Sequence, residues 1–205
     1  MECKGDTGLI KQQEFYDKYV RRAKERVVVI ISDAFRFEVG QTLLKRLMED
    51  EKCTASMDAM QSVLPSYTRF GMSALLPHRK LSMSNDYNVL VDGKVCDNLN
   101  SREQVLQSFV PNSRTVQFDD IKTMKIAELK EIFSGQEVVY VYHNQIDARG
   151  DKLNTENEVF TACEEAVEEI HTMIKRLTSA NNIRFIITAD HGFIYQRDLV
   201  ENYDK

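Results

Sequence analysis

Three short runs of β-branched and aromatic residues in this 205-residue chain each lead into acidic side chains. The runs and the residues that follow them are 27–31 with Asp33, 138–142 with Asp147 and Asp151, and 183–189 with Asp190 and His191. Continuous apolar runs of this length are typical of strands buried inside a parallel sheet. The carboxyl ends of parallel strands meet at one edge, where α/β proteins build their sites. We therefore expect an acidic site at that edge.

Amphipathic segments separate the three runs and predict helices between the strands. Helices are expected over residues 7–25, 38–51, 66–76, 119–133 and 155–177, weaker strands over 57–64 and 114–118, and a hairpin at Asp92-Gly93. No linker or repeat divides the chain, so we expect one domain over residues 1–205. Strands that alternate with helices predict an α/β fold, with a mostly parallel sheet covered by helices on both faces.

The composition is that of an ordinary globular protein, with 42% hydrophobic and 29% charged residues. A net charge of -5 gives no general attraction to nucleic acid or to anionic membranes. No apolar run approaches the roughly 20 residues that span a bilayer, and the first residues lack the apolar core of a secretory signal. The four cysteines are scattered without a C-x-x-C pair, which favours reduced thiols. We expect a cytoplasmic protein without a membrane partner.

The acidic residues have two interpretations. Asp33 and Asp190 can cap helices, and His191 can be a hydrogen-bonded structural residue. However, adjacent strand ends would bring both carboxylates close to Asp147 and Asp151, and the repulsion among four such groups is costly without cations. Two divalent ions would neutralise them, with imidazole as a neutral ligand. Mixed oxygen and nitrogen ligands favour zinc or manganese over magnesium.

Other side chains near these strand ends could also take part in chemistry. In the segment 64–77, Ser66 or Thr68 either caps a helix or offers a metal-activated hydroxyl that attacks phosphorus. Arg69 either clamps a phosphate or points to solvent. His143 either contacts the substrate or its surroundings, or is a buried structural histidine. The residues alone do not choose between these alternatives.

Four motifs, taken together and in this order, closely resemble the PglZ domain of BREX-type phage-defence proteins, which belongs to the alkaline phosphatase superfamily. The motifs are residues 28–38, with Ser32-Asp33-Ala34 at their centre, residues 65–69, residues 142–151 and residues 188–193, with Asp190-His191-Gly192. The resemblance implies an alkaline-phosphatase-like α/β fold with a phosphoesterase centre of up to two divalent ions.

The resemblance also assigns roles to individual residues. It implies that Asp33, Asp190 and His191 hold one ion and that Thr68 is the nucleophile and a metal ligand. Asp147 matches a ligand of the second ion.

Two departures from the family pattern concern this second ion. Asp151 stands where many relatives have histidine, which implies a changed metal preference. Superfamily members also supply a further histidine downstream, whereas this chain has none after His191. We therefore expect a fragment of a longer protein, with a second metal position that is empty or weak.

Three functions remain open at this stage. The first is metal-dependent hydrolysis of a phosphomonoester or phosphodiester, including a nucleotide or nucleic acid, in a phage-defence or signalling protein. The second is a catalytically incomplete domain that binds metal or nucleotide, or docks other defence-system proteins. A phosphoryl or nucleotidyl mutase ranks below both, because nothing in the sequence suggests a cap domain.

Overall fold

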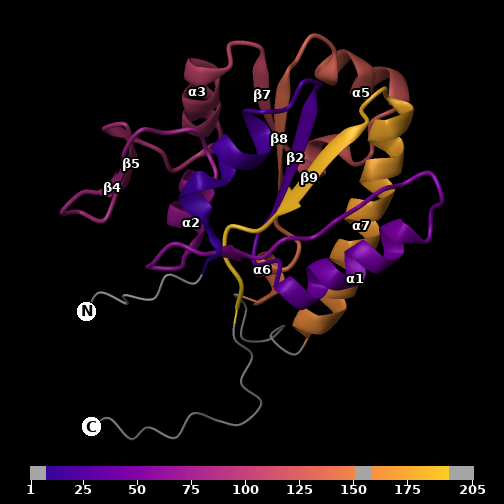
Figure 1. Ribbon diagram of the computed structural model, residues 1–205, viewed down its shortest axis with the longest axis horizontal. Coiled ribbons are helices and arrows are strands. Elements are labelled where there is room, and N and C mark those ends of the chain that lie inside the picture. The colour runs from indigo at the N-terminus through magenta and orange to yellow at the C-terminus, as the bar shows by residue number, and fades with distance from the viewer. Residues whose placement is uncertain (1–7, 151–157, 194–205) are drawn as a thin grey trace, which may run out of the picture.

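The computed structural model describes residues 8–150 and 158–193 of the chain. At its centre lies a four-stranded parallel sheet in the order β7-β8-β2-β9 (Figure 1). The strands are β7 (Ser113–Gln117), β8 (Val138–His143), β2 (Val27–Ser32) and β9 (Arg184–Thr188). The three strands predicted to carry the acidic residues are therefore neighbours. Their carboxyl ends meet at one edge of the sheet, as the sequence predicted.

The central strand β2 is buried along its whole length. Its side chains alternate between two cores, with Val28 and Ile30 in one and Val27, Val29 and Ile31 in the other. A strand with an apolar core on each face needs apolar residues at every position, which explains the uninterrupted run 27–31. The strand before Asp33 is therefore held on both faces.

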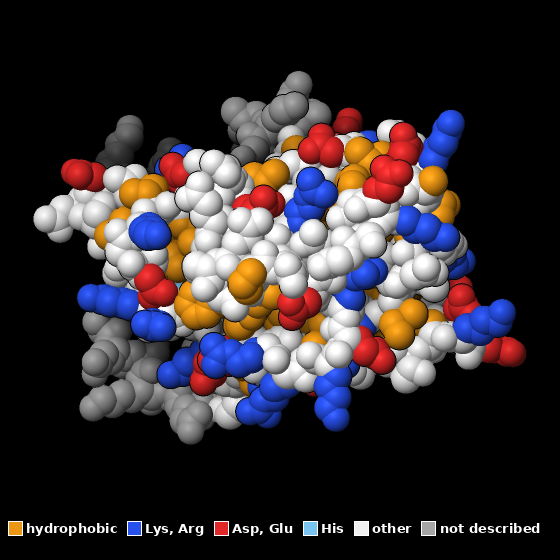
Figure 2. All heavy atoms as spheres, turned by 90° about the horizontal axis from the view of Figure 1, so that it is seen from above, with side chains coloured by type: hydrophobic (Ala, Val, Ile, Leu, Met, Phe, Trp, Pro, Cys, Tyr) orange, Lys and Arg blue, Asp and Glu red, His pale blue; other side chains and the backbone are white. Residues whose placement is uncertain are grey.

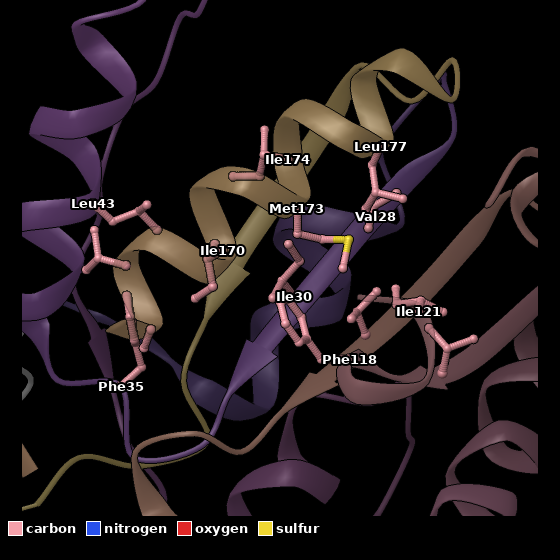
Figure 3. Packing of buried hydrophobic residues seen from close by; sticks show 14 of the residues in the cluster. Val28, Ile30, Phe35, Leu43, Phe118, Ile121, Ile170, Met173, Ile174 and Leu177 are labelled. Atoms are coloured by element: carbon pink, nitrogen blue, oxygen red, sulfur yellow. The ribbon is translucent and has the colours of Figure 1, made fainter. Parts of the chain in front are cut away.

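One face of the sheet is covered by α1, α4, α5 and α7 (Figure 1). These helices are α1 (Phe37–Met48), α4 (Phe118–Ile121), α5 (Ile126–Phe133) and α7 (Val159–Ser179). In Figure 3, Ile170, Met173 and Leu177 of α7 pack toward Val28 and Ile30 of β2. The apolar stripe predicted for this helix forms its buried face. Residues 155–157 of the predicted helix lie outside the described part of the chain.

The other face is covered by short helices and by a small antiparallel sheet. The helices are η1 (Gln12–Glu14), η2 (Tyr16–Val20), α2 (Thr68–Ala74) and α3 (Leu99–Phe109). The small sheet consists of β4 (Leu81–Met83), β5 (Val89–Val91) and β6 (Lys94–Val95), and a separate parallel pair joins β1 (Ile10–Lys11) to β3 (Met60–Gln61). Helices thus cover both faces of the parallel sheet, which confirms the predicted fold class.

Two predicted elements near the amino terminus are wrong in extent. The helix expected over 7–25 is replaced by β1, η1 and η2, which end at Val20. The strand expected over 57–64 shrinks to the two residues of β3. These two segments pair with each other, and the buried side chain of Gln12 hydrogen-bonds to the end of β9. Such long-range contacts override the local periodicity from which the helix was predicted.

The helix expected over 119–133 is also wrong, because it divides into α4 and α5. The break follows from a contact with α7. The Arg176 guanidinium donates hydrogen bonds to the carbonyl oxygens of Lys122 and Met124 between the two helices. These carbonyl groups are thereby satisfied without a continuous helix.

Among the described residues, no helix is both long and apolar enough to cross a bilayer. On the face of the molecule that Figure 2 shows, Lys and Arg side chains are intermixed with Asp and Glu. This face carries no extended field of one sign that would attract a polyanion.

The core predicts a simple stability test on α7. Ile170 is 0% exposed, whereas Met48 at the end of α1 is 62% exposed. Ile170→Ala is expected to lower the free energy of unfolding by about 2–5 kcal/mol, because it leaves a cavity under the sheet. Met48→Ala is the control, with an expected change within about 0.5 kcal/mol. Urea unfolding followed by circular dichroism measures both, and equal effects would contradict the assigned packing.

Candidate metal centre

Asp33 and Asp190 lie side by side at the carboxyl edge of the sheet. Strands β2 and β9 run parallel with Ile31 opposite Thr188, and each aspartate follows two residues later. The parallel register therefore brings both side chains to the same level of the edge. The two residues are almost completely buried, with exposed fractions of 3% for Asp33 and 0% for Asp190.

His191 completes the group and presents one ring nitrogen to both carboxylates. Its Nδ1 lies 2.9 Å from the carbonyl oxygen of Gly192. Because a carbonyl group can only accept, Nδ1 carries a proton, and in the neutral ring Nε2 therefore keeps a lone pair. Nε2 lies 3.3 Å from Oδ1 of Asp33 and 3.4 Å from Oδ2 of Asp190. A backbone carbonyl that fixes the tautomer in this way is typical of a metal-binding histidine.

The three ligand atoms face one another as hydrogen-bond acceptors. They lie within 4.8 Å of one another. Within the described part of the chain, Oδ1 of Asp33 and Oδ2 of Asp190 are buried without any hydrogen-bond donor. Ligands about 2.1 Å from a tetrahedral ion lie about 3.4 Å apart, which matches the distances to Nε2. The group therefore fits a divalent ion, and zinc or manganese suits its mixed oxygen and nitrogen donors.

The carboxyl groups show the electrostatic strain expected of such a cluster. Burial, followed by the negative charges of Asp190 and Asp147, raises the pKa of Asp33 to about 8. Burial also raises the pKa of Asp190, although hydrogen bonds to this carboxyl act in the opposite direction. Both shifts express the cost of burying negative charge at one point. A bound cation would remove much of that cost.

The turn after Asp33 supplies one of the stabilising hydrogen bonds. Ala34 has a φ of 60°, in the left-handed region that residues other than glycine seldom adopt. In this conformation the Ala34 N–H donates to Oδ1 of Asp190 over 3.2 Å. The strained turn therefore connects the end of β2 to the carboxylate at the end of β9.

Thr68, at the first turn of α2, brings a hydroxyl to the same group. Its Oγ1 lies 3.0 Å from Nε2 of His191, and the hydroxyl donates because Nε2 holds the lone pair. The close approach depends on Gly71, where a Cβ atom would collide with the carbonyl oxygen of Asp190. Gly71 thus lets α2 rest directly on the backbone of Asp190.

Gln12 also holds the backbone of Ala189 and Asp190 through hydrogen bonds. Its buried carboxamide donates hydrogen bonds to the carbonyl oxygens of Asp190 over 2.6 Å and of Ala189 over 3.3 Å. Its own oxygen accepts from the N–H of Val63 over 3.0 Å. The carboxamide therefore ties the end of β9 to the segment that leads into α2.

The remaining candidates lie around this core. Asp147 begins α6 (Asp147–Gly150), and its charge contributes to the raised pKa of Asp33, although it does not belong to the cluster of three ligands. Asp151 lies outside the described residues. Arg69 follows Thr68 in α2 and is exposed. The structure thus groups Asp33, Thr68, Asp190 and His191, with Asp147 near them.

His143 is buried behind the candidate ligands and does not face a substrate. The residue is 2% exposed. Its Nδ1 lies 2.8 Å from Oγ of Ser32, and its Nε2 lies 3.0 Å from Oε2 of Glu169. Both ring nitrogens are therefore engaged within the protein, and neither is left for a substrate.

Sequence reasoning missed Gln12, Gly71 and Ser32 as contributors to this site. A glycine inside a helical pattern signals a close approach of backbones, so Gly71 carried a readable signal. Gln12 and Ser32 carried none, because their partners Asp190 and His143 lie more than 100 residues away in the chain.

Comparison with known proteins identifies the family of the chain. Residues 13–205 match the family model described as the BREX system PglZ alkaline phosphatase-like domain. The chain is 41% identical over 204 residues to the alkaline phosphatase-like protein PglZ of Bacillus cereus. It is 35% identical over 206 residues to the alkaline phosphatase-like protein BrxZ of Escherichia coli. Each alignment covers 97% of this chain and 24% of the relative, so the chain spans about a quarter of their length.

The contact at Gly71 predicts an unequal response of two helical glycines to alanine. Gly71→Ala is expected to destabilise the protein by about 1–3 kcal/mol, because the new methyl group meets rigid backbone. The control is Gly40→Ala in α1, where the methyl group would meet the flexible end of Met57 at 2.9 Å and helix propensity favours alanine. Urea unfolding of both variants measures the difference. If the two changes are equally mild, α2 does not rest on Asp190.

The raised pKa of Asp33 predicts how the metal-free protein responds to pH. The ordinary pKa of aspartate is about 3.9, whereas that of Asp33 is about 8, so the native state keeps a proton that the unfolded chain releases between these values. Stability from this group is therefore full below about pH 4 and is lost as the pH rises toward 8.

Thermal unfolding in the presence of a chelator, from pH 5 to pH 8, measures this loss. Asp33→Asn is expected to make the fall in melting temperature smaller. Asp119→Asn, at an exposed ion pair with Lys122, is the control and should leave the slope unchanged. A slope that Asp33→Asn does not alter would mean that the cluster is not strained.

Proposed function

The chain belongs to the PglZ family of BREX-system alkaline phosphatase-like domains, and on this premise we propose that it carries the centre of a metal-dependent phosphoesterase with Thr68 as the nucleophile. The observation that supports the proposal is the position of the Thr68 hydroxyl, 3.0 Å from the nitrogen that two buried carboxylates also face. The Thr68 hydroxyl and the three candidate ligands come from three separate segments, namely the end of β2, the start of α2 and the segment after β9.

In this proposal Asp33, Asp190 and His191 hold a divalent ion, with zinc or manganese as the metal. When bound, the ion lowers the pKa of the neighbouring hydroxyl and offsets negative charge on the phosphoryl group. Threonine needs such activation, because its hydroxyl is a weak nucleophile at neutral pH. The hydrogen bond from Ala34 and the carboxamide of Gln12 keep the ligand residues in place.

Thr68 would attack the phosphorus atom of the ester. The bond to the leaving alcohol would break, and the phosphothreonine would then be hydrolysed by water. Arg69 is exposed beside Thr68, where its guanidinium can bind the phosphoryl oxygens. Asp147 would bind a second ion, since its negative charge acts on the neighbouring Asp33. Asp151, which lies outside the described residues, is proposed as a further ligand of that ion. The substrate class covers monoesters and diesters, including nucleotides and nucleic acid.

A second candidate function is a domain that binds metal or nucleotide, or docks other defence-system proteins, without turnover. It is favoured by the size of the described cluster, which holds three candidate ligands. Both functions place the domain in phage defence inside the bacterial cytoplasm.

Hydrolysis of para-nitrophenyl phosphate and of its bis-ester, with and without added zinc or manganese, separates the two. Thr68→Ala is expected to lower metal-dependent turnover by at least about a thousandfold, because the nucleophile is lost. Thr68→Ser keeps a hydroxyl and should retain part of the rate. Ser66→Ala removes a nearby exposed hydroxyl and serves as the control.

The assay is read together with the metal content of each variant. Metal bound by the wild type without turnover would support the binding domain. Turnover that survives Thr68→Ala would refute the nucleophile, and absence of metal binding would refute the centre itself.

A further inference from the structure

His143 connects four elements directly behind the metal centre. It is the last residue of β8, and its buried ring lies between Ser32 of β2 and Glu169 of α7. The ring of Phe118 in α4 packs edge-on against it, with the ring centres 4.6 Å apart. A polar ring in such a buried position is tolerated because both of its nitrogens are hydrogen-bonded.

The chemistry of the partners fixes the direction of these hydrogen bonds. A carboxylate can only accept, so Nε2 of His143 donates to Oε2 of Glu169. Nδ1 of the neutral ring then accepts from the Ser32 hydroxyl over 2.8 Å. The three side chains form one ordered chain of hydrogen bonds from the helix to the last residue of β2.

The same histidine also holds the next residue through its backbone. The carbonyl oxygen of His143 accepts the N–H of Asp33 over 2.8 Å. His143 therefore forms two hydrogen bonds at the end of β2, one with the side chain of Ser32 and one with the backbone of Asp33. This end of β2 carries Asp33, whose charged form is disfavoured by burial and by the negative charges of Asp190 and Asp147.

We infer that Glu169, His143 and Ser32 form a positioning network that holds Asp33 in its ligand position. The inference rests on the proposed metal centre and adds to it a set of residues that touch neither substrate nor ion. A ligand held in place before the ion arrives has less freedom to lose on binding, so the network strengthens metal affinity. Partners one step behind the ligands contribute in this way in other metal proteins.

The chain offers a matched control for this network. Glu165 lies one turn before Glu169 in α7 and accepts a hydrogen bond from the side chain of Gln145 over 3.0 Å. This contact also joins α7 to the segment after β8, but it does not reach Ser32 or Asp33. A purely structural contribution of α7 contacts would affect both glutamate variants alike.

Hydrogen exchange of the Asp33 amide, measured by NMR on the full chain without metal, tests the network directly. Ser32→Ala and Glu169→Ala are expected to speed exchange at Asp33 by about 3- to 10-fold relative to Val29 in the middle of β2. Glu169→Gln keeps an acceptor oxygen and should restore most of the protection. Glu165→Ala should leave the ratio unchanged. A general loss of stability would raise both amides together and leave the ratio unchanged.

Calorimetric titration with zinc provides the second readout. Ser32→Ala and Glu169→Ala are expected to weaken zinc affinity about tenfold, with Glu169→Gln and Glu165→Ala close to the wild type. The network would be overturned if the Ser32→Ala and Glu169→Ala variants exchanged the Asp33 amide at the wild-type rate. It would also be overturned if the wild type bound zinc and these variants bound it equally well. A wild type that binds neither zinc nor manganese would instead reject the proposed centre, and the exchange measurement would still decide the positioning of Asp33.

Discussion

The central constraint on this fold is that three hydrogen-bond acceptors must be kept together in a buried place. Oxygen atoms of Asp33 and Asp190 and the bare nitrogen of His191 face one another, and within the described residues Oδ1 of Asp33 and Oδ2 of Asp190 have no hydrogen-bond partner. Left to itself, such a group would separate or take up protons. The surrounding structure resists this: the parallel register of β2 and β9 sets the level of both aspartates, and the turn at Ala34 donates a hydrogen bond across the gap.

Much of the scaffold could be predicted because it depends on local patterns. Runs such as 27–31 are uninterrupted since β2 has a core on each face, and this pattern identifies a central strand without knowledge of its partners. Parallel strands have their carboxyl ends at one edge, so the convergence of Asp33, Asp190 and His191 followed from the alternation of strands and helices. The inclusion of Thr68 in the site was predicted only from the resemblance of its motif to the PglZ pattern.

The parts that could not be predicted depend on contacts between distant segments. The amphipathic pattern over 7–25 suggested one helix, but Gln12 is drawn to the backbone of Asp190 and the segment becomes irregular. The break between α4 and α5 depends on Arg176, which is 52 residues or more away from the carbonyl groups that it binds. The role of His143 depends on Ser32 and Glu169 together, and neither is recognisable from spacing.

The groups that hold the ends of β2 and β9 differ in kind from the groups they surround. The peptide N–H groups of Asp33 and Ala34 and the carboxamide of Gln12 have no ionisable proton in the physiological range. The hydrogen bonds from the Asp33 N–H and from Gln12 end on backbone carbonyl groups, so their strength does not depend on the charge of the carboxylates. The bond from Ala34 to Asp190 is strongest when that carboxylate is charged. The part of the frame that ends on backbone carbonyl groups therefore keeps its hydrogen bonds whether the enclosed carboxylates are charged or protonated.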